Sequence, residues 1–159
     1  MIMRLMKEII YLRMMKSIEY NQDNNRMFIL LSHILSYDIW FYMTHRFMHM
    51  REYWWIHKEH HEAEDPNWLD AHRGHFVENA ILFTGYCIPI FFGVYDLYES
   101  VIAFGIISIR GWLRHDKRTT WFDGGHHLYH HKVYNRNYGE PWLDYLFGTY
   151  TKPPPVNKS

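Results

Sequence analysis

The stretch HHLYHH, residues 126–131, places four histidines within six positions. Two earlier stretches have the same character, HRFMH at 45–49 and HKEHH at 57–61. Residues three and four positions apart share one face of a helix. Each stretch therefore directs two or three imidazoles toward one point, and the histidines concerned are His45, His49, His57, His60, His61, His127, His130 and His131.

These eight histidines indicate a metal centre. Neutral imidazole is a good ligand for iron, zinc, copper and nickel. Eight nitrogen donors exceed the three protein ligands of a catalytic zinc and suit two metal ions that keep open positions. The alternatives are unrelated surface histidines or a histidine-rich metal store. Such stores are low-complexity tracts, whereas these histidines recur at fixed intervals among Trp, Tyr and Phe.

Composition limits the remaining choices. A chain of 159 residues is normally one domain. Its 17 basic and 17 acidic residues balance, which argues against a nucleic-acid partner. The single cysteine, Cys87, excludes both a disulfide framework and a cysteine-based zinc site. The aromatic share of 19% fits a membrane protein whose Trp and Tyr lie at the interface.

Three apolar stretches, 27–43, 79–95 and 101–113, predict an all-α integral membrane helical bundle. Arg110 interrupts the third stretch. Residues 79–113 fit a helical hairpin, so the histidine clusters on either side of it share one compartment. Lys and Arg flank the hairpin but are absent from its joint at 96–100. By the positive-inside rule, the histidine-rich cap is cytoplasmic.

The chain divides into residues 1–26, an amphipathic N-terminal segment, residues 27–153, the membrane domain, and residues 154–159, a tail. The first segment fits a helix at the membrane surface or a soluble surface helix. Residues 21–25, NQDNN, predict a polar break after it. The basic residues of 1–26 fit the orientation poorly. Either this segment lies on the cytoplasmic surface and 27–43 only dips into the membrane, or a preceding span lies outside this chain.

The stretches DIWFYMTHRFMHM (38–50), WWIHKEHHE (54–62), AHRGHFVEN (71–79) and DGGHHLYHHKVYNRNYGEPWLDYLFGTYTKP (123–153) resemble the fatty acid hydroxylase/sterol desaturase superfamily. Its pattern is HxxxH, HxxHH and HxxHH, with Asn-Tyr-Gly and an Asp before Phe-Gly-Thr after the third box. The branch that the chain resembles most is the sterol C5-desaturases, the lathosterol oxidases.

The resemblance implies a membrane-bound oxygenase with a di-iron cap. Such enzymes use O₂ and two electrons, delivered by cytochrome b5 or a reductase, to desaturate or hydroxylate a lipid C–H site. The implied cofactors are two iron ions, and the favoured substrate is a sterol. In a eukaryote the location would be the endoplasmic reticulum membrane. The alternatives are a fatty acyl or sphingolipid hydroxylase and, from another class, a non-catalytic metal-binding membrane protein.

The resemblance also extends the set of site residues. His115, at the end of the hairpin, is expected as a ninth iron ligand and His75 as a tenth. Asp38, His126 and Asp144 are expected to support the ligand imidazoles by hydrogen bonds, as metal-bound histidines usually require.

Overall fold

The computed structural model of the chain describes residues 2–63 and 65–154, with side chains from residue 24 onward. Within these residues the chain is helical and contains no strand, so the all-α prediction is confirmed. The α-helices are α1 (Ile2–Met48), α2 (Trp54–His57), α3 (Phe76–Phe91), α4 (Leu97–Arg114), α5 (His126–Val133) and α6 (Pro141–Leu146). Short 3₁₀ turns are η1 (His60–Glu62), η2 (Trp68–His72) and η3 (Lys117–Thr119).

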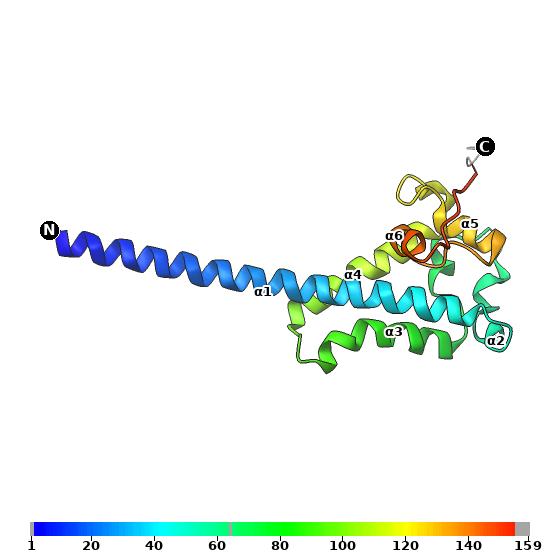
Figure 1. The fold of residues 1–159 in the computed structure, drawn as a ribbon, viewed down its shortest axis with the longest axis horizontal. Helices are drawn as coiled ribbons and strands as arrows, with labels where there is room; N and C mark the ends of the chain where they lie inside the picture. The colour runs from blue at the N-terminus through cyan, green and yellow to red at the C-terminus, as the bar shows by residue number, and fades with distance from the viewer. Residues whose placement is uncertain (1, 64, 155–159) are drawn as a thin grey trace.

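Helix α1 runs without interruption through residues 21–25, so the predicted break there is wrong. Asn, Gln and Asp each cost a helix only about 0.7 kcal/mol or less relative to Ala, and this stretch contains neither Gly nor Pro. With a rise of 1.5 Å per residue, α1 is about 70 Å long. Its N-terminal end extends away from the other helices (Figure 1). Residues 2–26 therefore do not fold back toward the histidines, and the side chains of 1–23, on which the amphipathic prediction rests, lie outside the described residues.

Helix α3 packs antiparallel against the C-terminal half of α1. The indole of Trp40 donates a hydrogen bond to the carbonyl of Ile81, at 2.7 Å. About two turns earlier in α1, Nδ1 of His33 donates to the carbonyl of Tyr86, at 2.9 Å. His33 is fully buried and its polar groups are satisfied, which fits the role of a core histidine.

Helix α4 packs against α1 in the parallel direction. Ser100 lies 3.0 Å from Nε2 of His33, and Arg110 donates to Asp38 at 2.7 Å. Arg110 also pairs with Glu140, the residue that precedes α6. These partners explain how a charged residue is accommodated in the third apolar stretch, since a buried charge must be paired.

The α3–α4 pair is thus a hairpin whose open ends lie near the C-terminal end of α1, beside α2, α5 and α6 (Figure 1). Its joint, residues 92–96, lies beside the middle of α1 (Figure 1). As predicted, the histidine-rich segments before and after the hairpin meet at one end of the molecule.

One helix among the described residues, Asn24–Met48 within α1, is long and apolar enough to cross a membrane. Helix α3 is apolar but has only 16 residues. An exposed stripe follows α1 at four-residue intervals and consists of Met27, Leu31, Leu35, Ile39 and Met43. Exposed apolar side chains in such a continuous row need an apolar environment.

The contact between α1 and α3 depends on Gly85. A Cβ atom built there would lie 2.5 Å from the Trp40 ring and 2.7 Å from its Cβ, so no side chain fits without moving the helices. Gly105 in α4 has open space around its position. Gly105 therefore serves as a control for Gly85, because both lie inside helices and only Gly85 is crowded.

We expect Gly85→Ala to destabilise the protein by about 1–3 kcal/mol through overpacking. Gly105→Ala should be neutral or stabilise it by up to about 1 kcal/mol, because Ala is the better helix former. Thermal unfolding in detergent, followed by circular dichroism, measures both. Equal melting temperatures for the two variants would contradict this account of the α1–α3 interface.

Candidate metal centre

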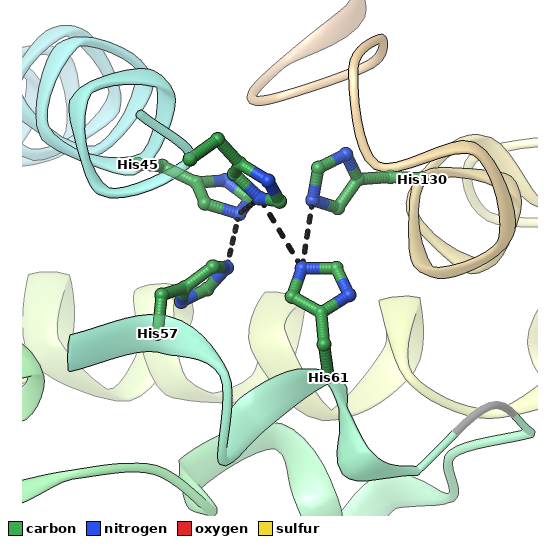
Figure 2. Close-up of side chains that lie close together, drawn as sticks. His45, His57, His61 and His130 are labelled. Carbon is green, nitrogen blue, oxygen red and sulfur yellow. Dashed lines mark hydrogen bonds between the residues drawn. The ribbon is translucent and has the colours of Figure 1, made fainter. Parts of the chain in front are cut away.

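Nine histidines lie together at the C-terminal end of α1 and form two groups. In each group, one ring nitrogen from every histidine lies within 4.8 Å of those of the other members. The five-histidine group consists of His45, His49, His57, His61 and His130. The four-histidine group consists of His60, His115, His127 and His131. Figure 2 shows four members of the larger group, whose rings come from different segments and point into one space.

Local helix geometry explains how the predicted clusters are divided. His45 and His49, one turn apart at the end of α1, belong to the same group. In α5, His127 and His131 share one group, while the neighbouring His130 faces the other. Each HxxHH box thus contributes to both groups: the two histidines four apart share one group, and the histidine between them belongs to the other.

The turn before helix α5 determines where the helix begins and in which direction it runs. Gly124 and Gly125 have φ of 67° and 76°, in the left-handed region that favours glycine. The Asp123 carboxylate accepts hydrogen bonds from the backbone N–H of Gly125 and of His127 at 2.8 and 3.2 Å. This turn aims the first residues of α5 at the end of α4, where His115 caps the helix.

Five of the nine imidazoles point their outer nitrogen, Nδ1, at an oxygen atom. The acceptors are the carbonyls of Tyr138 for His45, Arg73 for His60, Gly111 for His115 and Arg136 for His130, and the carboxylate of Glu78 for His57. A carbonyl oxygen can only accept, so four of these Nδ1 atoms carry the proton, and that of His57 does so when Glu78 is ionised. In the neutral ring, Nε2 then presents a bare lone pair.

His60 and His115 show the consequence most clearly. Both donate Nδ1–H to carbonyls, at 2.8 and 2.7 Å, and their Nε2 atoms lie 3.1 Å apart. His45 and His57 make the same contact in the larger group, with Nε2 atoms 2.8 Å apart. Two lone pairs at this distance repel each other unless a cation lies between them. Around a metal with bonds of 2.0–2.1 Å, neighbouring nitrogens would be about 2.8–3.4 Å apart, from octahedral to tetrahedral geometry. The donor set therefore fits metal ions.

A shared proton is the other cation that could separate such nitrogens, but burial opposes it. Burial lowers the pKa of His60, and burial with the neighbouring imidazoles lowers that of His115 well below its usual value. The same causes lower the pKa of His127 and His130 strongly and that of His131 to about 2. The rings are neutral at pH 7 and ready to bind metal.

The structure thus brings together nine of the ten histidines predicted as ligands and leaves out His75. Nδ1 of His75 accepts a hydrogen bond from the backbone N–H of Val77 at 3.2 Å and caps α3. Its ring packs edge-on against Trp55. With its nitrogen engaged at the helix start, His75 lies outside both groups.

The three residues predicted to support the ligands have other partners. Asp38 lies on the same face of α1 as His45, but two turns away, and pairs with Arg110 instead. Nε2 of His126 lies 3.0 Å from the Asp144 carboxylate. Asp144 also accepts from the backbone N–H of Tyr138, the residue whose carbonyl contacts His45. Asp144 therefore supports a ligand only through this loop.

Glu78 was missed in the sequence. Its Oε1 lies 2.7 Å from Nδ1 of His57, and both side chains are buried. Its position three residues after a histidine pair, in the first turn of an apolar helix, was the signal available. The four carbonyl acceptors had no signal at all, because any residue can supply a backbone oxygen.

A cavity of about 240 Å³ leads to the histidines from between α1, α3 and α4. Its polar lining includes five histidines, one carboxyl group and three guanidinium groups: His57, His60, His72, His115, His127, Glu78, Arg73, Arg110 and Arg114. Its apolar lining includes Phe41, Leu82, Phe83, Phe104 and Ile107. The cavity therefore combines apolar side chains with histidines of both groups.

Comparison with known proteins agrees with this geometry. The family model described as Fatty acid hydroxylase matches residues 30–149. Methylsterol monooxygenase 1 of Rattus norvegicus is 32% identical over 129 residues, which cover 70% of this chain and 43% of that protein. A putative methylsterol monooxygenase of Dictyostelium discoideum is 29% identical over 133 residues, covering 76% and 50%. No solved structure matches.

These matches confirm the predicted superfamily. The relatives are methylsterol monooxygenases, so the narrower resemblance to sterol C5-desaturases stays a prediction. The chain spans about half the length of the curated relatives that it matches.

The lowered histidine pKa values predict how stability depends on pH in the metal-free protein. In the unfolded chain imidazoles take up protons near pH 6.5, whereas the buried rings do so only at much lower pH. Between pH 7 and 5.5 the unfolded state therefore binds more protons. The free energy of unfolding should decrease as the pH falls through this window. Glu78, whose pKa burial raises to about 8, opposes this trend with one proton, but the nine grouped imidazoles outnumber it.

Thermal unfolding in a chelating buffer measures this effect, with a melting temperature that falls steadily from pH 7 to 5.5. A melting temperature that stays constant over this range would show that the imidazoles are accessible to protons in the folded state.

Proposed function

The chain belongs to the fatty acid hydroxylase family, and we propose that it is a membrane-bound oxygenase that holds two iron ions and hydroxylates or desaturates a lipid. The observation that carries the proposal is the pair of opposed Nε2 lone pairs in each histidine group, with outer nitrogens that donate to fixed oxygens. When bound, the two irons would supply the O₂ chemistry that breaks an unactivated C–H bond, which side chains alone cannot do.

The nine grouped histidines would hold the metals. Five nitrogens in one group and four in the other leave positions free for O₂ in an octahedral arrangement. Imidazole donors leave the site cationic, unlike the carboxylate-rich sites of soluble di-iron bundles. The outer hydrogen bonds of five rings keep their Nε2 lone pairs directed inward and so set much of the ligand geometry before metal arrives.

The cavity supports a lipid as the substrate. Its lining combines aromatic and aliphatic side chains with histidines of both groups, Glu78 and three arginines. At about 240 Å³ it is smaller than most small-molecule pockets, so it would enclose the reacting part of a lipid rather than all of it. A sterol is favoured, because two relatives are named for methylsterols. A fatty acyl or sphingolipid chain is the alternative.

The surroundings of the site fit a membrane enzyme. The span Asn24–Met48 would anchor the protein, and α3 and α4 would enter the same bilayer as a hairpin. The histidine end would face the cytoplasm, by the distribution of Lys and Arg around the hairpin. There it could receive electrons from cytochrome b5 or a reductase. In a eukaryotic cell the location would be the endoplasmic reticulum.

Metal content tests the proposal. Protein purified from iron-replete cells without a metal-affinity tag should contain close to two irons per chain. His130→Ala removes a buried ligand and should lower that content, whereas His75→Ala, outside both groups, should leave it unchanged. Elemental analysis with a thermal melt of each variant measures this. Zinc alone, or no stoichiometric metal in the unsubstituted protein, would favour a non-catalytic metal-binding membrane protein or a degenerate relative.

Filling the cavity should block the substrate and spare the metals. We expect Leu82→Trp to reduce lipid turnover by at least about tenfold, since a larger side chain occupies the space that the lipid needs. Ile90→Trp changes an exposed position of the same helix and serves as the control.

The assay supplies a methylsterol or a fatty acid with ¹⁸O₂ and a chemical reductant. Mass spectrometry then detects an added oxygen from O₂ or the loss of two hydrogens. Equal turnover by the two tryptophan variants would contradict the placement of the substrate in this cavity.

A further inference from the structure

Glu78 differs from every other acceptor around the metal centre. Among the described residues it is the one carboxylate that contacts an imidazole of either group. The remaining acceptors of Nδ1 are neutral backbone carbonyls. The two histidine groups are therefore unequal, since only the five-histidine group contains a ring whose Nδ1 faces a carboxyl group.

The local structure is built to hold this carboxylate. Glu78 lies in the first turn of α3, where the helix dipole favours a negative charge. Gly74 leaves the space for it, because a Cβ atom there would lie 2.8 Å from Oε2. The side chain is only 4% exposed, and its Oε2 atom is buried without a hydrogen-bond partner. Burial raises the pKa of this carboxyl group to about 8, so a nearby cation is needed to stabilise its ionised form at pH 7.

We propose that Glu78 is a positioning residue that fixes His57 and makes the five-histidine group the tighter of the two metal sites. The proposal rests on the metal centre put forward above. A carboxylate that accepts from Nδ1–H holds the ring with Nε2 toward the metal and raises the basicity of that nitrogen. Metal bound at His57 in turn compensates the charge of Glu78, which explains why the protein buries it.

The count of donors acts in the same direction. The larger group offers five nitrogens and the smaller one four, so the carboxylate adds to an existing advantage. The smaller group contributes three of the five histidines that line the cavity, and the larger group contributes His57. Both sites therefore face the cavity, the weaker one through more of its ligands.

Cobalt(II) provides a probe, because its visible absorption reports ligand binding directly. Chelator-treated protein, full length and in detergent, is titrated with Co²⁺. We expect two binding steps. Glu78→Gln, which keeps the shape but loses the charge, should weaken the tighter step about tenfold, and Glu78→Ala about 10- to 100-fold. The weaker step should move by less than about twofold.

Glu99→Gln is the matched control. Glu99 is also buried in the first turn of a helix and also has an unpartnered oxygen, but it contacts Arg26 rather than a histidine. This variant should leave both binding steps unchanged. Circular dichroism confirms that each variant is folded before the titration.

Two further backgrounds assign the affected step. In His131→Ala, which damages the four-histidine group, Glu78→Gln should still weaken the remaining step. In His61→Ala, which damages the five-histidine group, it should have no further effect. Unchanged affinities in both Glu78 variants, or an equal loss in the His61→Ala background, would overturn this proposal and leave the metal centre intact. If the unsubstituted protein bound no stoichiometric Co²⁺, the metal centre itself would fail, and this proposal with it.

Discussion

The opposed lone pairs of buried, neutral imidazoles are the constraint on which the rest of the molecule depends. Burying one polar ring without a partner already costs free energy, and nine rings gathered at the end of α1 multiply that cost. The fold reduces it on the outer side by giving five Nδ1 atoms fixed acceptors. On the inner side it leaves the Nε2 atoms facing one another, which is favourable only around cations. The stability of this end of the protein is therefore tied to metal binding.

The helices that carry the site are held together by polar contacts inside an apolar bundle. His33 bridges α1 to α3 and α4, and Arg110 joins α4 to Asp38 of α1. Gly85 allows α1 and α3 to approach closely at Trp40. These contacts are specific in register, because each requires one residue opposite another. They place the end of α4, and with it His115, against His60 and the histidines of α5.

The sequence predicted the helical class and most of the site, because both leave a periodic signal. The spacing of the three histidine boxes follows the helical repeat, so eight ligand candidates could be identified before any fold was known. His115 came only from the family resemblance, since a single histidine carries no spacing. His75 shared that weakness, and the structure shows it capping α3. Its role as a helix cap depends on the residue at which α3 begins, and a sequence defines helix ends poorly.

Partners across the fold could not be predicted from spacing. Asp38 lies on the same face of α1 as His45, but two turns away along the helix. At that level it faces Arg110 of α4 and pairs with it. Glu78 meets His57 only because α3 returns along α1, and the carbonyl acceptors depend on loop conformations that many sequences could adopt. The continuity of α1 through residues 21–25 was missed because polar residues resemble a loop in composition while costing a helix little.

The central claim is that the two histidine groups converge on metal ions rather than on protons or water. X-ray absorption at the iron edge of the iron-loaded protein tests it most directly, because the fine structure reports the atoms bound to the metal. The account predicts a shell of nitrogen at about 2.0–2.2 Å with the multiple-scattering pattern of four to five imidazoles per iron. A shell dominated by oxygen, or one or two imidazoles per iron, would contradict it.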